Sequence, residues 1–184
     1  MVAALARAGV RANHVTVAAA LVSIALGAVL CRAQDHRAFF FALPAWMFLR
    51  MAANAVDGML AREHGHKSPL GAYLNELTDV VSDAALYLPM VWVGGGWPAV
   101  AAFIAASMVS EMAGAMGPMV GAPRAYNGPM GKSDRAFLIG LLGLLVALGV
   151  PVGPWISPLL WAATALIGLN TIQRVRSGVA RSQG

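Results

Sequence analysis

Carboxylate and amide side chains recur at helical spacing in one part of the chain, between residues 54 and 83. Asn54, Asp57 and Ala61 fall on one helical stripe. A second stripe consists of residues four apart, namely Gly71, Asn75, Asp79 and Asp83. Two carboxylates with flanking amide oxygens are donors that suit Mg²⁺ or Mn²⁺. We therefore predict a divalent metal site made by four residues: Asp57, Asp79, Asn54 and Asn75.

Two predicted helices must position these stripes, and a short turn joins them. Residues 63–69 contain a glycine and a proline and have the length of a tight connection, so the helices should form an antiparallel hairpin. In such a hairpin the residue numbers of two positions at the same depth add up to a nearly constant value. Position 57 should therefore lie opposite 75, 54 opposite 79 and 50 opposite 83. Asp57 and Asp79 should therefore face each other. Arg50 should reach Asp83, because an intramembrane Asp–Arg pair satisfies both charges.

The composition indicates a membrane protein. Hydrophobic residues make up 59% of the 184 residues and charged residues only 11%, which is far from the balance of a soluble domain. The formal charge of +5 does not indicate nucleic acid, because the basic residues form no run with interleaved aromatics. The single cysteine, Cys31, excludes an intrachain disulfide framework. We expect one domain, residues 1–184, with membrane lipids around it.

The hydropathy pattern predicts an all-α fold, an integral membrane bundle of six transmembrane helices. The predicted spans cover residues 14–30, 38–60, 70–93, 98–120, 136–150 and 155–172, each near the ~20 residues that cross a bilayer. Residues 1–13 carry Arg7 and Arg11 among small apolar residues, which is typical of a short amphipathic helix at the membrane interface. A secretory signal peptide is the alternative for this segment, although further apolar spans follow it.

The distribution of lysine and arginine predicts the orientation of the bundle. Ten basic residues lie in the N-terminal segment, the second and fourth loops and the C-terminal tail, which includes Arg174. The opposite side has two, Arg32 and Arg37. We therefore expect a multi-pass protein of the cell inner membrane with both termini in the cytoplasm. Asp57 and Asp79 would lie toward the cytoplasm, within reach of a water-soluble nucleotide.

The stretch from residue 54 to 83 resembles the signature of the CDP-alcohol phosphatidyltransferase family, class I, which reads D-x-x-D-G-x-x-A-R and then G-x-x-x-D-x-x-x-D. Six positions match in identity and spacing: Asp57, Gly58, Ala61, Arg62, Gly71 and Asp79. Asn54 and Asn75 stand where the pattern has its first and third aspartates. An asparagine can still offer oxygen to a cation, but each change removes one negative charge. We therefore expect one metal ion rather than two, unless Asp83 contributes.

The resemblance implies an activity and a partner. A CDP-alcohol such as CDP-diacylglycerol would bind with its diphosphate on the metal, an alcohol acceptor would attack, and CMP would leave, as in phospholipid biosynthesis. Asp79 occupies the position of the presumed base. The implied nucleotide-binding residues are Asp57, Gly58, Ala61, Arg62, Ser68 and Gly71. Close helix packing is the alternative explanation for the small residues among them. The resemblance also implies a homodimer.

A basic cluster marks a candidate acceptor site. It comprises Arg124, Lys132 and Arg135, in the fourth loop and at the start of the fifth span. A phosphorylated or otherwise anionic acceptor would suit it. The alternative is that these residues only set the membrane topology. Glu111, which is alone in the fourth span, either partners Arg50 or lines the cavity.

Two other classes of function remain open. A catalytically degenerate family member would bind CDP-lipid or metal without turnover, and Asn54 and Asn75 favour that alternative. A small ion transporter would use the buried carboxylates of the spans. Transport is less well supported, because the sequence has no evident inverted repeat and transport does not explain the Asp-Gly-x-x-Ala-Arg spacing.

Overall fold

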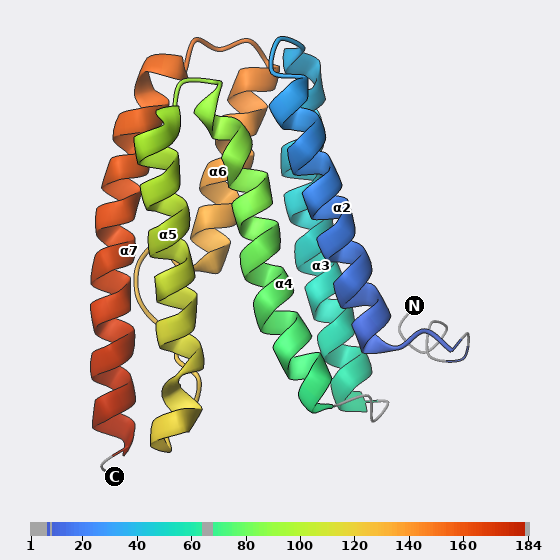
Figure 1. Ribbon diagram of the computed structural model, residues 1–184, viewed down its shortest axis with the longest axis vertical. Coiled ribbons are helices and arrows are strands. Elements are labelled where there is room, and N and C mark those ends of the chain that lie inside the picture. Colours follow the sequence, from blue (N-terminus) through green and yellow to red (C-terminus); the bar gives the residue numbers. More distant parts are fainter. Residues whose placement is uncertain (1–6, 8, 64–67, 183–184) are drawn as a thin grey trace.

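The computed structural model is an elongated bundle of helices that run along its longest axis (Figure 1). It describes residues 7, 9–63 and 68–182. All regular elements in these ranges are helical, and the long ones are α2 (Ala12–Arg32), α3 (Ala42–Glu63), α4 (Pro69–Tyr87), α5 (Gly96–Ala115), α6 (Lys132–Ala147) and α7 (Gly153–Ser182). Successive long helices alternate in direction. Helix α2 begins and α7 ends at the same end of the bundle, as the topology prediction requires (Figure 1).

Short 3₁₀ helices connect or extend the long ones. They are η1 (Arg37–Phe41), η2 (Leu88–Val91) and η3 (Gly117–Val120). Pro89 lies in the first turn of η2, and Gly94 and Gly96 follow with φ of 119° and 69°, a conformation that favours glycine. The chain therefore reverses between α4 and α5, as predicted for the end of the third span.

Four segments are long and apolar enough to cross a membrane: Ala12–Arg32, Arg37–Ala61, Gly96–Ala115 and Gly153–Ser182. Helix α6 has 16 residues, fewer than the ~20 that span a bilayer, and α4 carries three carboxylates. Large apolar side chains are nevertheless exposed on both of these helices, for example Leu77 and Phe137. Six membrane spans therefore stay a prediction, whereas an all-helical membrane protein is supported.

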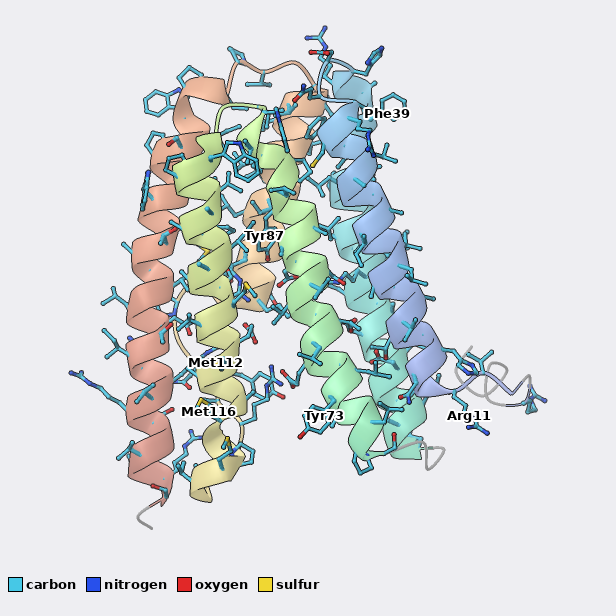
Figure 2. All side chains as sticks on the ribbon, viewed as in Figure 1. Arg11, Phe39, Tyr73, Tyr87, Met112 and Met116 are labelled. Carbon is cyan, nitrogen blue, oxygen red and sulfur yellow. The ribbon has the colours of Figure 1, made fainter. Side chains whose placement is uncertain are left out.

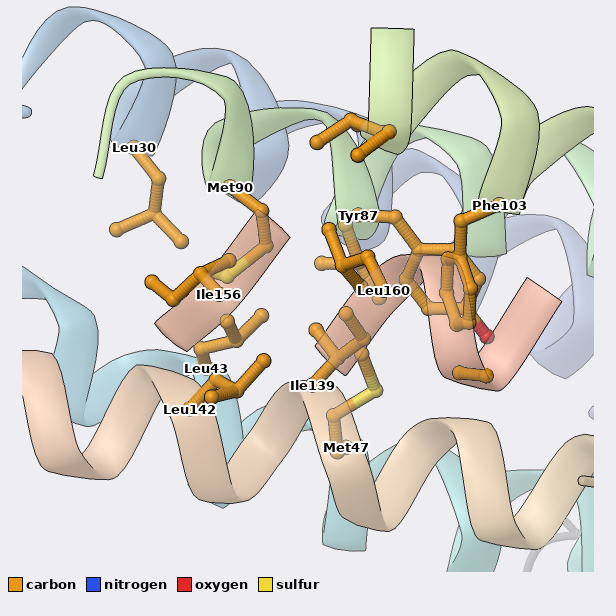
Figure 3. Packing of buried hydrophobic residues seen from close by; sticks show 14 of the residues in the cluster. Leu30, Leu43, Met47, Tyr87, Met90, Phe103, Ile139, Leu142, Ile156 and Leu160 are labelled. Atoms are coloured by element: carbon orange, nitrogen blue, oxygen red, sulfur yellow. The ribbon is translucent and has the colours of Figure 1, made fainter. Parts of the chain in front are cut away.

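The apolar core occupies the end of the bundle where η1, η2 and the α6–α7 connection lie. Figure 3 shows Leu43, Met90, Ile139 and Leu160 packed together there, all of them buried. The rings of Tyr87 and Phe103 lie 5.1 Å apart between centroids. This packing holds the helices together at one end, and the polar residues of the predicted site lie toward the other.

Helices α2 and α4 approach closely at Gly27. A Cβ atom at this position would lie 2.2 Å from the carbonyl oxygen of Ala85, so a side chain there has no room. Small residues permit such close approach of helix backbones in membranes. The contact holds α2 along α4, and the N-terminal half of α2 becomes a wall of the predicted site.

The last helix is longer than predicted. It reaches Ser182, ten residues beyond the predicted end of the sixth span at residue 172. Asn170, Arg174 and Gly178 are buried at intervals of four, so one face stays packed after the apolar run has ended. The assignment of Arg174 to a tail beyond the last helix is therefore wrong. The predicted interfacial helix at residues 1–13 lies mostly outside the described residues.

Candidate active site

A cavity of about 1020 Å³ opens between the two halves of the bundle at the end remote from the apolar core. Helices α2, α3 and α4 form one wall, and α5, α7, the loop 121–131 and the start of α6 form the other. Figure 2 places Tyr73 of α4 and Met116, which follows the end of α5, at this end, with Tyr87 in the middle of the bundle. Ten of the twelve predicted site residues line the cavity: Asn54, Asp57, Gly58, Ala61, Ser68, Gly71, Asn75, Asp79, Arg124 and Lys132.

The remaining two predicted site residues differ from these. The side chain of Arg62 lies outside the described part of the chain. Arg135 is fully buried behind the cavity wall, where its Nη2 donates to Glu111 Oε1 at 2.7 Å and lies 3.9 Å from Asp83 Oδ2. A second nitrogen of Arg135 donates to the carbonyl of Met130 at 3.1 Å. The structure therefore does not bring Arg135 into the cavity with the other basic residues.

Asp57 is held by a residue of α2. Thr16 Oγ1 donates to Asp57 Oδ2 at 2.8 Å, and the same hydroxyl also contacts the carbonyl of Ala12 at 3.1 Å. The carboxylate is buried, with 6% of the residue exposed, yet it lines the cavity. A carboxylate fixed by one oxygen keeps lone pairs of the other for a ligand.

Asp79 lies at the centre of a larger set of contacts. Arg50 Nη2 donates to Asp79 Oδ1 at 3.1 Å, and Asn54 Nδ2 donates to the same oxygen at 3.2 Å. The ammonium of Lys132 contacts the other oxygen, Oδ2. The contact between Asn54 and Asp79 confirms the predicted register of the hairpin. Lys132 comes from the start of α6, and no helical periodicity relates it to Asp79 of α4.

The predicted ion pair between Arg50 and Asp83 is present. Arg50 Nη1 contacts Asp83 Oδ1, and both residues are buried, with 5% and 6% exposed. Arg50 therefore bridges two carboxylates that lie one helical turn apart on α4. This arrangement fixes Asp79 beside Asn54 and leaves Asp83 beneath the cavity, outside its lining.

Ser68 and Gly71 form the start of α4. Ser68 caps the helix, and its Oγ accepts a hydrogen bond from the Gly71 backbone N–H at 3.0 Å. A Cβ atom at Gly71 would lie 2.8 Å from Asn13 Oδ1, so glycine allows α2 to approach here. These two residues have clear structural roles in addition to their place in the cavity wall.

Glu111 joins three arginines from three different segments. Its Oε1 accepts from Arg135 at 2.7 Å and from Arg174 at 3.3 Å, and its Oε2 accepts from Arg124 at 3.2 Å. Glu111 therefore lines the cavity and does not partner Arg50, which decides between the two predicted alternatives. Arg124 also contacts Glu76 of α4 on the opposite wall. Burial lowers the pKa of Arg124, although the group remains a cation at neutral pH.

Sequence reasoning missed two residues of this cluster. Arg174 was assigned to the tail, although its spacing of four from Asn170 could have indicated a continued helix face. Glu76 follows Asn75 and lies beside the predicted stripe, yet its side chain reaches the cavity. Ser110 supports the same corner, because its hydroxyl donates to Asn170 Oδ1 at 3.0 Å and its carbonyl accepts from Arg174 at 2.7 Å.

Among the described residues no group of three or more His, Cys, Asp or Glu side chains is placed to hold a metal. The predicted donors are two carboxylates, Asp57 and Asp79, and the amides of Asn54 and Asn75, all in the cavity wall. Two negative charges balance one divalent cation, and oxygen is its preferred donor. The donor set thus fits one divalent cation and lacks the charge for two.

The fold and the site define a class of protein. The family model for CDP-alcohol phosphatidyltransferases matches residues 10–172, and the chain belongs to this family. The inner membrane protein YnbA of Escherichia coli is 42% identical over 170 residues, which cover 91% of this chain and 84% of YnbA. The archaetidylinositol phosphate synthase of Aeropyrum pernix is 30% identical over 146 residues, 73% of each chain.

A solved structure shares the fold. The phosphatidylinositol phosphate synthase PgsA1 of Mycobacterium tuberculosis, crystallised with CDP-DAG bound, superimposes with a TM-score of 0.79 and 22% sequence identity. The match covers 96% of this chain and 90% of that one. The same synthase has also been solved in complex with manganese and citrate, with a TM-score of 0.78. The bundle of this chain is therefore the fold of a known membrane synthase.

We expect Asp83→Asn to lower the stability of the protein. The change removes one of the two carboxylates that neutralise the buried Arg50, and breaking a buried pair costs about 3–5 kcal/mol. Thermal unfolding in detergent should show a lower melting temperature, whereas Asp35→Asn, which alters an exposed carboxylate of the opposite end, should not change it. An unchanged melting temperature for Asp83→Asn would contradict a structural role for the pair.

Proposed function

We propose that the protein transfers a phosphatidyl group from a CDP-linked lipid, such as CDP-diacylglycerol, to an alcohol acceptor and releases CMP. The observation that carries the proposal is that Asp57 and Asp79 line one cavity together with the small residues of the signature. Membership of the family supports the reaction class, and the solved relative of the same fold had CDP-DAG bound.

The nucleotide side of the cavity would be the wall formed by α3 and the start of α4. Gly58 and Ala61 have little or no side chain, so a ligand can approach the backbone of α3 there. Gly71 also lines this wall, where its missing side chain makes room for Asn13 of α2. Ser68 adds a hydroxyl at the cavity edge, and we assign Arg62 to the same group on the strength of the signature alone. Phosphate binding by nearby cations and backbone groups is common for such sites.

One divalent cation, Mg²⁺ or Mn²⁺, would be held by oxygens of the four predicted metal ligands: Asp57, Asp79, Asn54 and Asn75. Bound there, it would neutralise the diphosphate of the donor, which is a main contribution to phosphoryl transfer. The manganese complex of the solved relative supports this choice of cation.

Asp79 is the proposed general base. It would accept the proton of the acceptor hydroxyl as the new oxygen–phosphorus bond forms and the bond to CMP breaks, so that CMP leaves with the electron pair. Lys132 contacts Oδ2 of Asp79, so this oxygen already has a partner in the structure. The diphosphate of the donor offers Lys132 an alternative anion, which would free Asp79 Oδ2. We therefore expect the donor to bind before the acceptor hydroxyl is deprotonated.

A second candidate is a protein that binds CDP-lipid without turnover. The occupation of both oxygens of Asp79 by Arg50, Asn54 and Lys132 favours it, because neither oxygen is free to accept the proton of an acceptor hydroxyl. We favour the enzyme, since the contact to Oδ2 comes from Lys132, which lines the cavity and which a phosphorylated donor can draw away. Release of CMP distinguishes the two candidates.

We also propose that the protein is a six-span homodimer of the cell inner membrane with its termini and active site in the cytoplasm. The start of α2 and the end of α7 lie at one end of the bundle (Figure 1). The cavity lies at the same end, and the basic residues Arg124 and Lys132 line it. The dimer rests on the family resemblance alone, and light scattering in detergent would measure it.

Metal binding should follow the charge of the site. Titration calorimetry with Mn²⁺ should give about one ion per chain, and Asp57→Ala should abolish binding because one of two carboxylate donors is lost. Asp35→Asn serves as the control and should bind normally. Two ions bound to the unmodified protein would contradict the argument from charge.

Turnover should depend on Asp79. Purified protein with CDP-diacylglycerol, saturating Mg²⁺ and a panel of alcohols should release CMP, measured by chromatography. Asp79→Asn should reduce the rate by about 10²-fold or more, the usual contribution of a general base, while Glu63→Gln, at the exposed end of α3, should not. No CMP with any alcohol would favour the binding protein. A variant that kept the native rate would refute Asp79 as the base.

Cysteine labelling should reveal the orientation. In a Cys31→Ser background, Asp35→Cys should react with an impermeant maleimide on intact spheroplasts, because residue 35 lies at the end of the bundle opposite the cavity. Ser182→Cys, at the end of α7, should react only after the membrane is permeabilised. The reverse pattern would place the cavity outside the cytoplasm.

A further inference from the structure

The second wall of the cavity contains two guanidinium groups that already carry carboxylate partners. Arg124 and Arg174 both line the cavity, on the side opposite the signature residues of α3. Free guanidinium groups at such a place would form a phosphate site, because their planar donors match phosphate oxygens. The structure instead provides each of them with protein oxygens.

Glu111 and Glu76 supply the carboxylates. Glu111 accepts from Arg174 Nη1 at 3.3 Å and from Arg124 Nη2 at 3.2 Å, and Arg174 Nη1 also donates to the carbonyl of Ser110 at 2.7 Å. Glu76 contacts Nη1 of Arg124 from the opposite wall. An anionic group could bind these guanidiniums only by displacing Glu76 from Arg124 or Glu111 from both arginines. Glu111 is buried, and a buried carboxylate without a partner is costly.

The total charge of the cavity lining also disfavours the binding of a further anionic group. Among the described lining residues, five carboxylates oppose three cations, a formal charge of −2. One divalent cation would bring this charge to zero, and the diphosphate of the donor would make it negative again. A phosphate monoester on the acceptor would add about −1.5 to −2 more at neutral pH, with no unpaired cation left on this wall to receive it.

We infer that the acceptor is an uncharged polyhydroxy alcohol rather than a phosphorylated one. A hydroxyl group donates one hydrogen bond and accepts others, so it can bridge a carboxylate and a guanidinium without displacing either. Nε of Arg124 is buried and lacks a hydrogen-bond partner among the described residues, which leaves a donor that a hydroxyl oxygen can satisfy. The inference rests on the proposed function and makes its acceptor more specific.

Matched pairs of acceptors test it. CMP release from CDP-diacylglycerol would be measured in nanodiscs with Mg²⁺, using glycerol against glycerol 3-phosphate and inositol against inositol 1-phosphate. We expect kcat/KM to favour the uncharged member by at least about tenfold, the effect of a modest electrostatic penalty. Preference for the phosphorylated member in both pairs would overturn the inference.

Charge-removing variants test the cause of the selectivity. Glu76→Gln frees one side of Arg124, and Glu76 is only half-buried, so this variant should fold. The ratio of kcat/KM for phosphorylated over uncharged acceptor should rise about tenfold. Folded Glu111→Gln protein should show a higher ratio as well. Glu63→Gln removes a carboxylate from the same end of the bundle without touching Arg124 and should leave the ratio unchanged. An unchanged ratio in Glu76→Gln would contradict the assignment.

Binding separates this inference from the proposed function. The four acceptors would be titrated into the donor-loaded protein, and binding would be measured as a rise in the melting temperature. This measurement does not require turnover. Tighter binding of the phosphorylated members would overturn the inference whether or not CMP is released. Absence of CMP with all four acceptors, together with tighter binding of the uncharged members, would contradict the enzyme and support the acceptor class.

Discussion

The cost of an unpaired charge inside an apolar bundle governs this structure. Arg50 lies within α3, where water cannot solvate it, and it contacts both Asp79 and Asp83 of α4. These contacts fix the register of the two helices, because a shift by one residue would turn both carboxylates away from Arg50. The positions of Asp57 and Asn54 relative to Asp79 follow from that register. The ion pairs thus determine the geometry of the site before any ligand binds.

The bundle separates packing from chemistry along its length. Apolar side chains such as Leu43 and Met90 fill one end (Figure 3). The tight approach of α2 to α4 at Gly27 adds to the contact there. Because this end holds the helices together, the other end can remain open around a cavity of about 1020 Å³. Glu111 lies at the boundary, where it connects α5 to Arg135 behind the wall and to Arg174 in it.

The part of the site that could be predicted from the sequence is local. Helical periodicity and a short turn sufficed for the pairing of Arg50 with Asp83 and of Asn54 with Asp79, since both pairs lie within one hairpin. The contact of Lys132 with Asp79 and of Arg174 with Glu111 joins segments far apart in the chain, and no periodicity relates them. The length of α7 was underestimated because its apolar run ends before its packed face does.

Every charged side chain that the structure describes in the cavity lining has a hydrogen-bond or ion-pair partner within the protein. Lys132 occupies an oxygen of Asp79, and Glu76 occupies Arg124 across the opening. A ligand that binds at Asp79 or at Arg124 must therefore exchange with an existing ion pair, and the net gain is the difference between two interactions rather than the whole of one. Exchange favours ligands that match the displaced group. A diphosphate can replace Asp79 as the partner of Lys132, whereas a hydroxyl group can join Arg124 and Glu76 without separating them.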